Sequence, residues 1–446
     1  AHTALGALAL RRGRIETAEE HLAQAVARVT ANHTRARSGK AQNLHGLALQ
    51  HLGRVQAARE AFAAAAWDRA FTGPASLAQA RLESTAGAQE RALLLVNRAV
   101  AADPQSTAAL ALQSALLRHA GQPDAAFAAT TQALEIDPLD SLVARERALA
   151  REAGATGEPH PTLDATAAAA LRWLDDDQYA LEAAHDYARA GLLDEALAVL
   201  EARLPADRSD AVADPLVAYT LGWLHQWGGD TAAAAVWYGR GRELPPDYAF
   251  PFRLESIAVL QAAMAMDAAD PRAPYYLGNL LYDHQPGRAI EMWEKARDLD
   301  PGHARVHRNL AFAYARARGD LEAAVASQEK AVTLAKDEPR LYYELDQLLT
   351  WSGAPLAKRL DWLEESPQTV ARRDITRARL ARALLLDGRA DETLETLGEG
   401  RFHVWEGERG IHEVYVAARL TRGRDELGRG DAERALAEFQ AAVAVP

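Results

Sequence analysis

Two consecutive stretches, GAQERALLLVNRAVAADP (87–104) and GQPDAAFAATTQALEIDP (121–138), carry the pattern that decides the fold. In each stretch a glycine, two alanines and a proline are spaced 5, 7 and 5 residues apart, and the second copy follows the first by 34 residues. A period of about 34 residues predicts a series of helical hairpins. The residues in question are Gly87, Ala92, Ala99 and Pro104, then Gly121, Ala126, Ala133 and Pro138.

Each of these positions has a physical role in a hairpin. The glycine ends the first helix, because a residue without a Cβ adopts the left-handed conformation at no steric cost. The two alanines lie on one stripe of the second helix, two turns apart, and let the first helix pack closely against it. The proline ends the second helix, since it lacks an N–H and restricts the residue before it.

The same frame recurs along most of the chain. It is weaker from about 340 to 400, where Gly353 and Gly388 are retained but Lys358 and Thr393 replace the small residue. We therefore predict an all-α protein of about a dozen hairpins, several of them degenerate. The further copies are Gly13, Ala18, Ala25; Gly53, Ala58, Ala65; Gly229, Ala234, Gly241, Pro246; Ala289, Ala296, Pro301; Gly319, Ala324, Ala331; and Gly430, Ala435, Ala442.

Composition limits the classes of function. The 446 residues have a formal net charge of −12, so bulk attraction to nucleic acid or to an anionic membrane is not expected. Cysteine is absent, which excludes disulfides and thiol catalysis and is consistent with a reducing, cytoplasmic location. Because the repeat is already in phase at residue 1, we also expect a segment upstream of it.

The repeat resembles the tetratricopeptide repeat (TPR). Two copies carry the Leu-Gly pair of the first helix: YTLGWLHQWGGDTAAAAVWYGRGRELPP (219–246) has Leu221-Gly222, and YYLGNLLYDHQPGRAIEMWEKARDLDP (275–301) has Leu277-Gly278. The resemblance implies a right-handed α-solenoid whose first helices line a concave face. It also implies a scaffold that binds a peptide or a partner protein there.

Four shorter segments resemble a narrower group, the helical repeat region of a family of long bacterial proteins. In that family a β-rich N-terminal domain that binds or processes carbohydrate precedes the helices. This resemblance implies an alternative function, an accessory region supporting an upstream domain of a carbohydrate-active enzyme. The segments are NHTRARSG (32–39), AFAAAAWD (61–68), YAFPFRLESIAVLQAA (248–263) and RFHVWEGERG (401–410).

Two interruptions of the pattern suggest domain organisation. Segment 154–163, rich in Gly and Pro, is a candidate hinge between an N-terminal array (1–153) and a C-terminal array (164–446); the alternative is a loop without independent motion. An inserted helical segment lies near 248–270. There we expect the solenoid core to be filled by Phe250, Phe252, Leu254, Ile257 and Leu260.

No catalytic or cofactor motif is evident in the sequence. Gly-rich phosphate loops, G-x-S-x-G and H-E-x-x-H are all absent. His303 and His307 lie four residues apart, as a metal-binding pair does, but no third ligand is visible. We therefore expect no metal and no cofactor, and we favour a binding function over an enzymatic one.

Counting the first-helix Leu as position 7, the TPR resemblance places positions 2, 5, 9 and 12 in the groove, with position 6 at its border. Arginine offers bidentate donors to carboxylates, and tyrosine offers a flat contact area. This set suits an acidic peptide or a sugar; the alternative is that the arginines pair with acids of neighbouring repeats. The predicted groove residues are Arg272, Tyr275, Asn279, Tyr282, Arg305, Arg308, Asn309, Phe312, Arg340, Tyr343, Tyr219 and Trp223, and earlier repeats provide a weaker groove that includes Arg81 and Arg118.

The segment RFHVWEGERG (401–410) lies before the last hairpin and is too apolar to be a solvated loop. We expect Phe402 and Trp405 to fill a gap in the core between hairpins. The alternative is a docking loop, formed by Phe402, His403, Trp405 and Glu406, for a partner or for an N-terminal domain of the same polypeptide.

Overall fold

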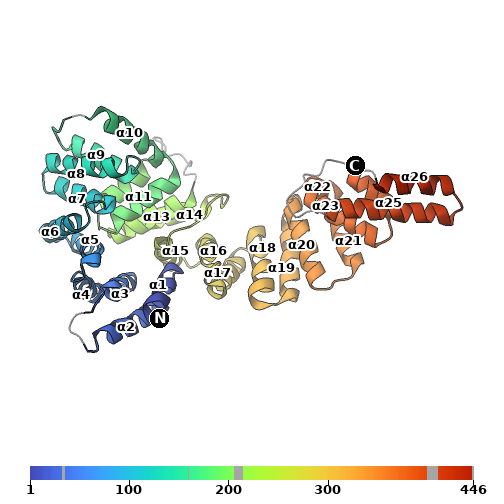
Figure 1. The fold of residues 1–446 in the computed structure, drawn as a ribbon, viewed down its shortest axis with the longest axis horizontal. Coiled ribbons are helices and arrows are strands. Elements are labelled where there is room, and N and C mark those ends of the chain that lie inside the picture. The colour runs from blue at the N-terminus through green and yellow to red at the C-terminus, as the bar shows by residue number, and fades with distance from the viewer. Residues whose placement is uncertain (33–35, 159, 205–213, 399–409, 444–446) are drawn as a thin grey trace. The chain divides into compact units, whose positions relative to one another are not determined.

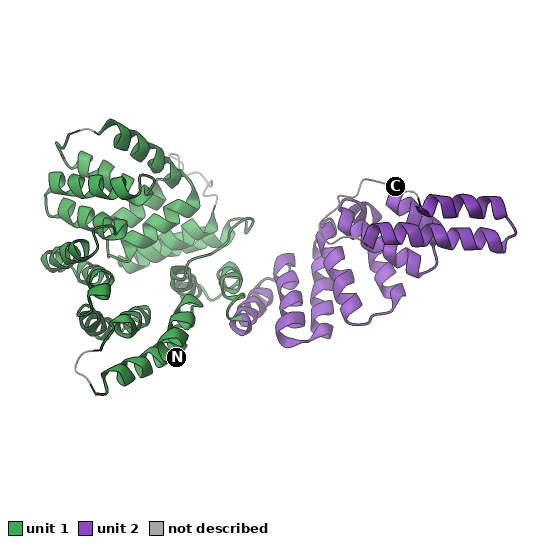
Figure 2. Ribbon diagram, viewed as in Figure 1, with its two compact units in different colours: residues 1–285 green, residues 286–446 purple. Residues whose placement is uncertain are grey.

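The computed structural model describes residues 1–32, 36–158, 160–204, 214–398 and 410–443 (Figure 1). These residues form helices and connecting turns, and none of them lies in a β-strand. The chain divides into two compact units, Ala1–Gln285 (unit 1) and Pro286–Pro446 (unit 2) (Figure 2). Each unit is built from helical hairpins, so the predicted all-α solenoid architecture is confirmed.

Unit 1 contains seven hairpins followed by two further helices. In each hairpin the first helix packs against the second. The pairs are α1 (His2–Arg11) and α2 (Ile15–Thr30), α3 (Lys40–His51) and α4 (Val55–Ala65), α5 (Arg69–Thr85) and α6 (Gln89–Ala102), α7 (Thr107–His119) and α8 (Pro123–Ile136), α9 (Ser141–Glu152) and α10 (Pro161–Leu171), α11 (Asp177–Ala188) and α12 (Leu193–Glu201), and α13 (Pro215–Trp227) and α14 (Thr231–Glu243); a 3₁₀ turn η1 (Arg172–Asp175) precedes α11, and α15 (Glu255–Met266) and α16 (Arg272–Leu281) follow α14.

Unit 2 begins with α17 (Pro286–Leu299) and continues with four hairpins. Their first helices, α18, α20, α23 and α25, provide the surface on which the predicted groove depends. We call this surface the first-helix face. The pairs are α18 (Ala304–Ala313) and α19 (Leu321–Leu334), α20 (Pro339–Trp351) and α21 (Leu356–Glu365), α23 (Asp374–Leu386) and α24 (Ala390–Gly398), and α25 (Gly410–Gly428) and α26 (Ala432–Val443), with the short α22 (Pro367–Ala371) before α23.

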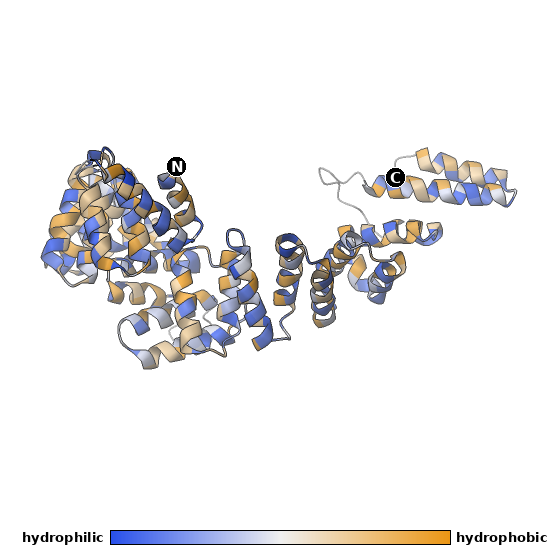
Figure 3. Ribbon diagram, turned by 90° about the horizontal axis from the view of Figure 1, so that it is seen from below, coloured by the Kyte–Doolittle hydropathy of each residue, from blue (hydrophilic) through white to orange (hydrophobic). Residues whose placement is uncertain are grey.

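The repeat positions behave as the sequence predicts. Every turn glycine of the frame has a positive φ, from 66° at Gly13 to 89° at Gly229. Every alanine of the frame is buried, including both alanines of the quoted hairpins. The helices are amphipathic, and Figure 3 shows hydrophobic and hydrophilic residues alternating along them. Small residues therefore pack hairpin against hairpin, as the 34-residue period requires.

A second glycine position explains the Leu-Gly pair of the first helix. In four hairpins a glycine of the first helix lies directly against a large side chain 16 residues later, and a Cβ built on that glycine would lie 2.4–2.6 Å from it. Such distances are well below van der Waals contact, so only glycine fits there. The pairs are Gly6 and Leu22, Gly46 and Phe62, Gly222 and Tyr238, and Gly423 and Phe439.

One hairpin contains an extra residue. Leu345 lies 8 residues before the turn glycine Gly353, whereas Leu310 lies 9 residues before Gly319. The end of α18 continues as a π-helical turn, η2 (Tyr314–Arg318), directly before Gly319. A π turn accommodates one added residue without changing the face on which the following helix packs, so the repeat frame is preserved beyond it.

The turn between α1 and α2 contacts the last residues of unit 1. The Arg14 guanidinium donates to the carbonyl oxygen of His284 at 2.6 and 3.2 Å, and Gln285 Nε2 donates to the carbonyl oxygen of Arg12 at 3.0 Å. A Cβ on Gly13 would lie 3.1 Å from Leu254 Cδ2. The hairpins of unit 1 thus close on themselves over about 270 residues of sequence.

Buried ion pairs connect the hairpins inside unit 1. The Arg118 side chain of α7 donates to Glu146 of α9 at 3.3 Å and to Glu195 of α12 at 2.8 Å. The hydroxyl of Tyr187 in α11 donates to Glu146 at 2.7 Å, and the pKa of His119 is raised by its hydrogen bond with Glu195. The inner residues of these hairpins, Arg118 among them, are therefore engaged within unit 1.

Segment 154–163 lies inside unit 1, since the division between the units falls after Gln285. Its described residues are anchored: Thr156 N donates to Asp124 at 2.6 Å, Arg151 donates to the carbonyl oxygen of Gly157 at 2.8 Å, and Gly157 packs on Phe127. The second helix of this hairpin, α10, begins at Pro161, within the segment. Whether the segment acts as a hinge stays a prediction.

The inserted segment near 248–270 differs from the expectation at its start. Leu260 is buried in the core, but Phe250 and Phe252 are 63 % and 46 % exposed, so the prediction that both fill the core is wrong. Residues 249–252 lie outside regular secondary structure, and Ala249 and Pro251 are the buried members of this stretch. Because the exposed and buried side chains alternate, the two phenylalanines lie on the solvent side.

The buried His185 of α11 makes unit 1 sensitive to acid. Burial lowers its pKa from 6.5 to about 4; Glu255 and Asp186 oppose this shift, whereas Arg253 and Arg189 add to it. Since the unfolded chain takes up this proton near pH 6.5 and the folded chain near pH 4, the stability contribution of His185 is present above pH 6.5 and is lost as the pH falls to 4.

We expect His185→Phe, which keeps a ring beside Trp223, to remove this loss. At pH 7.5 the free energy of unfolding of the variant should lie within about 1 kcal/mol of that of the natural chain. At pH 4.5 it should exceed that of the natural chain by about 2 kcal/mol. Urea unfolding at the two pH values, followed by circular dichroism, measures the difference. An equal difference at both pH values would contradict the role of this histidine.

Candidate functional site

The predicted groove residues are divided between the two units. Unit 1 contains Arg272, Tyr275, Asn279, Tyr282, Tyr219 and Trp223, and unit 2 contains Arg305, Arg308, Asn309, Phe312, Arg340 and Tyr343. Arg305 and Arg340 are exposed, and most of the others are half-buried. Within each unit these residues form a separate candidate surface.

In unit 1, Tyr219 and Tyr275 lie in the core instead of on an open surface, at 0 % and 6 % exposure. The ring of Tyr219 lies against Gly241 of α14, where a Cβ would be 3.0 Å from the ring. Its hydroxyl donates to the buried Asp270 at 2.7 Å, and burial together with Asp270 raises the pKa of Tyr219. A glycine in place of the usual alanine thus makes room for a tyrosine that the counting scheme placed in the groove.

Trp223 is half-buried and belongs to an aromatic cluster. Its ring centroid lies 5.0 Å from that of Trp227 and 6.2 Å from that of His185. His185 and Phe252 line the same small cavity beside α13, which has a volume of only about 10 Å³. This cavity holds no more than one water molecule, so it is too small for a ligand side chain.

In unit 2, the first-helix face contains a buried carboxylate shared by two arginines. Glu344 of α20, 4 % exposed, accepts from Arg308 Nε at 2.6 Å and Nη2 at 2.5 Å. Arg340 Nε donates to the same carboxylate at 2.8 Å. Arg308 therefore follows the predicted alternative, in which arginines of the groove pair with acids of neighbouring repeats. Because two guanidinium groups share one carboxylate, the group of three side chains still has a net charge of +1.

A second shared carboxylate lies two residues further along α20, roughly half a turn around the helix. Asp346, 1 % exposed, accepts from Arg359 of α21 at 2.7 and 3.2 Å and from Arg379 of α23 at 3.5 Å. The Arg379 guanidinium also lies over the ring of Tyr343, 5.1 Å from its centroid. This group of three side chains again has a net charge of +1, and its partly exposed member on α23 is Arg379.

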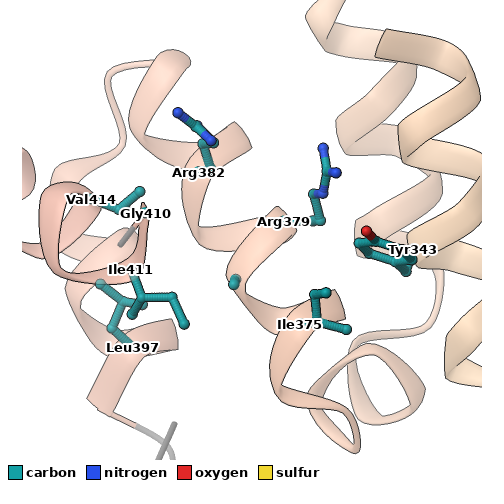
Figure 4. A pocket seen from close by; sticks show the side chains of 9 residues that line it. Tyr343, Ile375, Arg379, Arg382, Leu397, Gly410, Ile411 and Val414 are labelled. Atoms are coloured by element: carbon teal, nitrogen blue, oxygen red, sulfur yellow. The ribbon is translucent and has the colours of Figure 1, made fainter. Parts of the chain in front are cut away.

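A pocket of about 230 Å³ opens beside Arg379 (Figure 4). Arg379, Tyr343 and Ile375 lie on one side of it and Leu397, Ile411 and Val414 on the other, with Arg382 near Gly410. Among the described residues that line it, none is acidic. Besides Tyr343 and the two arginines, the lining residues are Ile375 and Ala378 of α23, Leu397 of α24, and Gly410, Ile411 and Val414 of α25.

Sequence reasoning found only Tyr343 among these lining residues. If Leu380 is counted as position 7 of α23, Ile375, Ala378 and Arg382 occupy positions 2, 5 and 9, and Arg379 occupies position 6. Gly388 already set this frame. Thr393, which replaces the small residue of the second helix, is fully buried, and its hydroxyl donates to the carbonyl oxygen of Arg389 at 2.9 Å.

Arg382 of α23 lines the pocket together with Arg379. It is exposed, and among the described residues it forms no ion pair. Its Nη1 lies 4.0 Å from the Cβ position of Gly410, at the rim of the pocket. An incoming carboxylate would meet this guanidinium without displacing a partner that the structure describes.

Other predicted features can be placed only in part. Phe402, His403, Trp405 and Glu406 lie outside the described residues, so both interpretations of that loop stay predictions. His307 is buried and hydrogen-bonds the carbonyl oxygen of Pro301 at 2.9 Å; in the part of the chain that the structure describes, no cluster of three or more His, Asp or Glu residues suits a metal ion. None of the described helices is long and apolar enough to cross a bilayer.

No protein-family model matches this chain. Among solved structures it is similar to YrrB, described as a TPR protein with an unusual peptide-binding site, at 20 % identity over 41 % of this chain and 90 % of that one, with a TM-score of 0.33. It is similar to Pseudomonas aeruginosa PilF at 15 % identity over 53 % and 95 % (TM-score 0.31), and to yeast Tom70 at 12 % identity over 91 % of both chains (TM-score 0.26). At these scores the likenesses carry no argument about function, and the TPR-like character of the chain rests on its own hairpins.

Proposed function

We propose that the protein is an interaction scaffold that binds an acidic segment of a peptide or partner protein on the first-helix face of unit 2. The observation that carries the proposal is the pair of buried carboxylates, Glu344 and Asp346, each shared by two arginines. Each group leaves one excess positive charge in a chain whose net charge is −12. A local positive surface on an acidic protein favours acidic partners.

Aromatic side chains accompany these charges. Phe312 is half-buried, and the guanidinium groups of Arg308 and Arg316 lie 5.8 and 5.4 Å from its ring centroid. The guanidinium group of Arg379 likewise lies over the ring of Tyr343. Aromatic side chains have few rotamers, and the rigid planar fork of a guanidinium group loses less entropy for each hydrogen bond that it forms, so both suit binding of an extended segment. The surface suits recognition, and we assign it no catalytic step.

Binding of blocked heptaglutamate to the full chain tests the proposal. We expect fluorescence anisotropy to show binding that weakens from 50 to 300 mM salt, because the contacts are charge pairs. The double variant Arg340→Gln and Arg382→Gln should weaken it about tenfold, which corresponds to ~1.4 kcal/mol. Both arginines are exposed, so the fold should tolerate the change.

Arg434→Gln provides the control, since Arg434 of α26 is an exposed arginine of unit 2 whose ion-pair partner among the described residues is Asp431, the residue just before this helix. Its binding curve should match that of the natural chain. If the control loses as much affinity as the double variant, the peptide senses only overall charge and the first-helix face is not the site.

We propose as a second candidate that the chain is an accessory region of a carbohydrate-active enzyme. The observation that favours it is the row of exposed aromatic side chains at Tyr248, Phe250 and Phe252 in unit 1, of which Tyr248 is 90 % exposed. Exposed rings provide flat apolar surfaces on which sugars stack. Isothermal titration calorimetry with a glucan hexasaccharide tests this proposal. Binding that the double variant Tyr248→Ala and Phe250→Ala abolishes would support it, and the absence of any heat of binding to the natural chain would refute it.

A further inference from the structure

We infer that the 230 Å³ pocket between α20, α23, α24 and α25 is an anchor site for one aliphatic side chain flanked by side-chain carboxylates in an extended partner segment. The inference rests on the proposed scaffold function and names the kind of sequence that the scaffold recognises. Its basis is a lining that combines two guanidinium groups, of Arg379 and Arg382, with aliphatic side chains (Figure 4).

The aliphatic part of the lining comes from Ile375 of α23, Leu397 of α24, and Ile411 and Val414 of α25. Burying an apolar side chain among these groups removes hydrocarbon from water on both partners. A cavity of about 150 Å³ already admits benzene, so about 230 Å³ accommodates a leucine, isoleucine or valine side chain.

The two guanidinium groups that line the pocket determine which groups must flank the bound aliphatic side chain. Arg379 is only partly neutralised, since it shares Asp346 with Arg359, whose contact with the carboxylate is shorter. Arg382, one turn further along α23, has no ion-pair partner among the described residues. An aliphatic group alone would leave both guanidinium groups facing an apolar ligand, whereas adjacent carboxylates would pair with them.

The charges also favour side-chain carboxylates over a single terminal one. A second excess positive charge lies on the same face at Arg308 and Arg340, beside Glu344. One C-terminal carboxylate supplies a single negative charge, whereas an extended segment with several acidic residues neutralises both groups. We therefore assign the site to an internal segment in which acidic residues surround the aliphatic anchor.

Isoleucine methyl NMR provides a direct readout at the pocket. The chain contains six isoleucines, of which Ile375 and Ile411 line the pocket and Ile15, Ile136, Ile257 and Ile290 do not. The probe is acetyl-Gly-Ser-Asp-Leu-Asp-Ser-Gly-amide, titrated into the full chain. We expect the δ1-methyl signals of Ile375 and Ile411 to shift in a saturable way, while those of Ile15 and Ile136 in unit 1 stay in place.

Three further peptides separate the parts of the proposal. Replacing both Asp by Asn, or Leu by Gly, should each weaken binding at least tenfold. A peptide without acidic residues that ends in a free leucine carboxylate should bind no more tightly than the Asn peptide. Equal or tighter binding of that peptide would show that the site takes a terminal carboxylate and would overturn the assignment to internal segments.

Ala378→Leu tests the pocket without changing charge, because the half-buried Ala378 lines it and a larger side chain fills it. We expect at least a tenfold loss of affinity for the Leu peptide with an unchanged or higher melting temperature. Ala437→Leu, at an exposed alanine of α26, should bind normally. Acidic peptides that bind and respond to Arg340→Gln, with no shift at Ile375 or Ile411, would refute the anchor while leaving the scaffold proposal standing.

Discussion

Gly222→Val is expected to lower the free energy of unfolding of unit 1 by about 3 kcal/mol, because overpacking of a fully packed contact costs this much. A Cβ at this position would lie 2.6 Å from Cδ1 and 2.8 Å from Cε1 of Tyr238. The tyrosine ring cannot move aside easily: it is 2 % exposed, and its hydroxyl donates to Gln226 at 2.8 Å. Urea unfolding followed by circular dichroism measures the change.

Gly239→Ala is the matched control in the facing helix. Nothing lies within 4 Å of a Cβ at this position, so alanine should stabilise α14 by about 0.5–1 kcal/mol through helix propensity alone. Combining Gly222→Val with Tyr238→Leu should recover part of the loss, since the smaller side chain makes room. Equal effects of the two glycine substitutions would show that propensity, and not the contact with Tyr238, decides stability.

The hairpins could be predicted because their determinants are local. A turn glycine, two alanines and a proline all act within one hairpin, so their spacing alone specifies helix, turn, helix and end. The structure accordingly has positive φ at Gly87 and Gly121 and buries Ala126 and Ala133 completely. Even the extra residue before Gly319 is absorbed locally, by the π turn after α18.

The closure of unit 1 could not be predicted in this way. The bond between Arg14 and the His284 carbonyl joins residues 270 positions apart, and neither residue has a pattern that distinguishes it from other exposed residues. The burial of Tyr219 likewise depends on two other elements, Gly241 in α14 and Asp270 before α16. Repeat counting gives the direction of a side chain on its own helix, but neighbouring elements decide whether that side is open.

The candidate site was predicted in part for the same reason. Counting from the repeat frame identified Arg308, Arg340 and Tyr343 as residues of one face, and the structure brings Arg308 and Arg340 together on Glu344. It did not identify Asp346, which occupies the position held elsewhere by Gly222 or Gly423. A carboxylate in place of a small residue is accommodated there because Arg359 of the second helix pairs with it.

Asp346→Asn is expected to lower the free energy of unfolding of unit 2 by about 3 kcal/mol, the effect typical of removing one partner from a buried ion pair. Asparagine keeps the shape but presents an NH₂ donor and no charge to Arg359, whose side chain is only 11 % exposed. Asp298→Asn is the control, because Asp298 is 67 % exposed and pairs with Arg297 at the surface. It should change stability by less than about 0.5 kcal/mol.

Binding should move in the opposite direction from stability in this variant. Without Asp346 the guanidinium of Arg379 has no carboxylate to share, so the positive charge beside the pocket increases by one. Under conditions where the variant is fully folded, heptaglutamate should bind about three- to tenfold more tightly than to the natural chain. Affinity that falls together with stability would show that Asp346 orients Arg379 for binding. That result would reverse the role proposed here, in which Asp346 stabilises the hairpin and restrains the charge of the site.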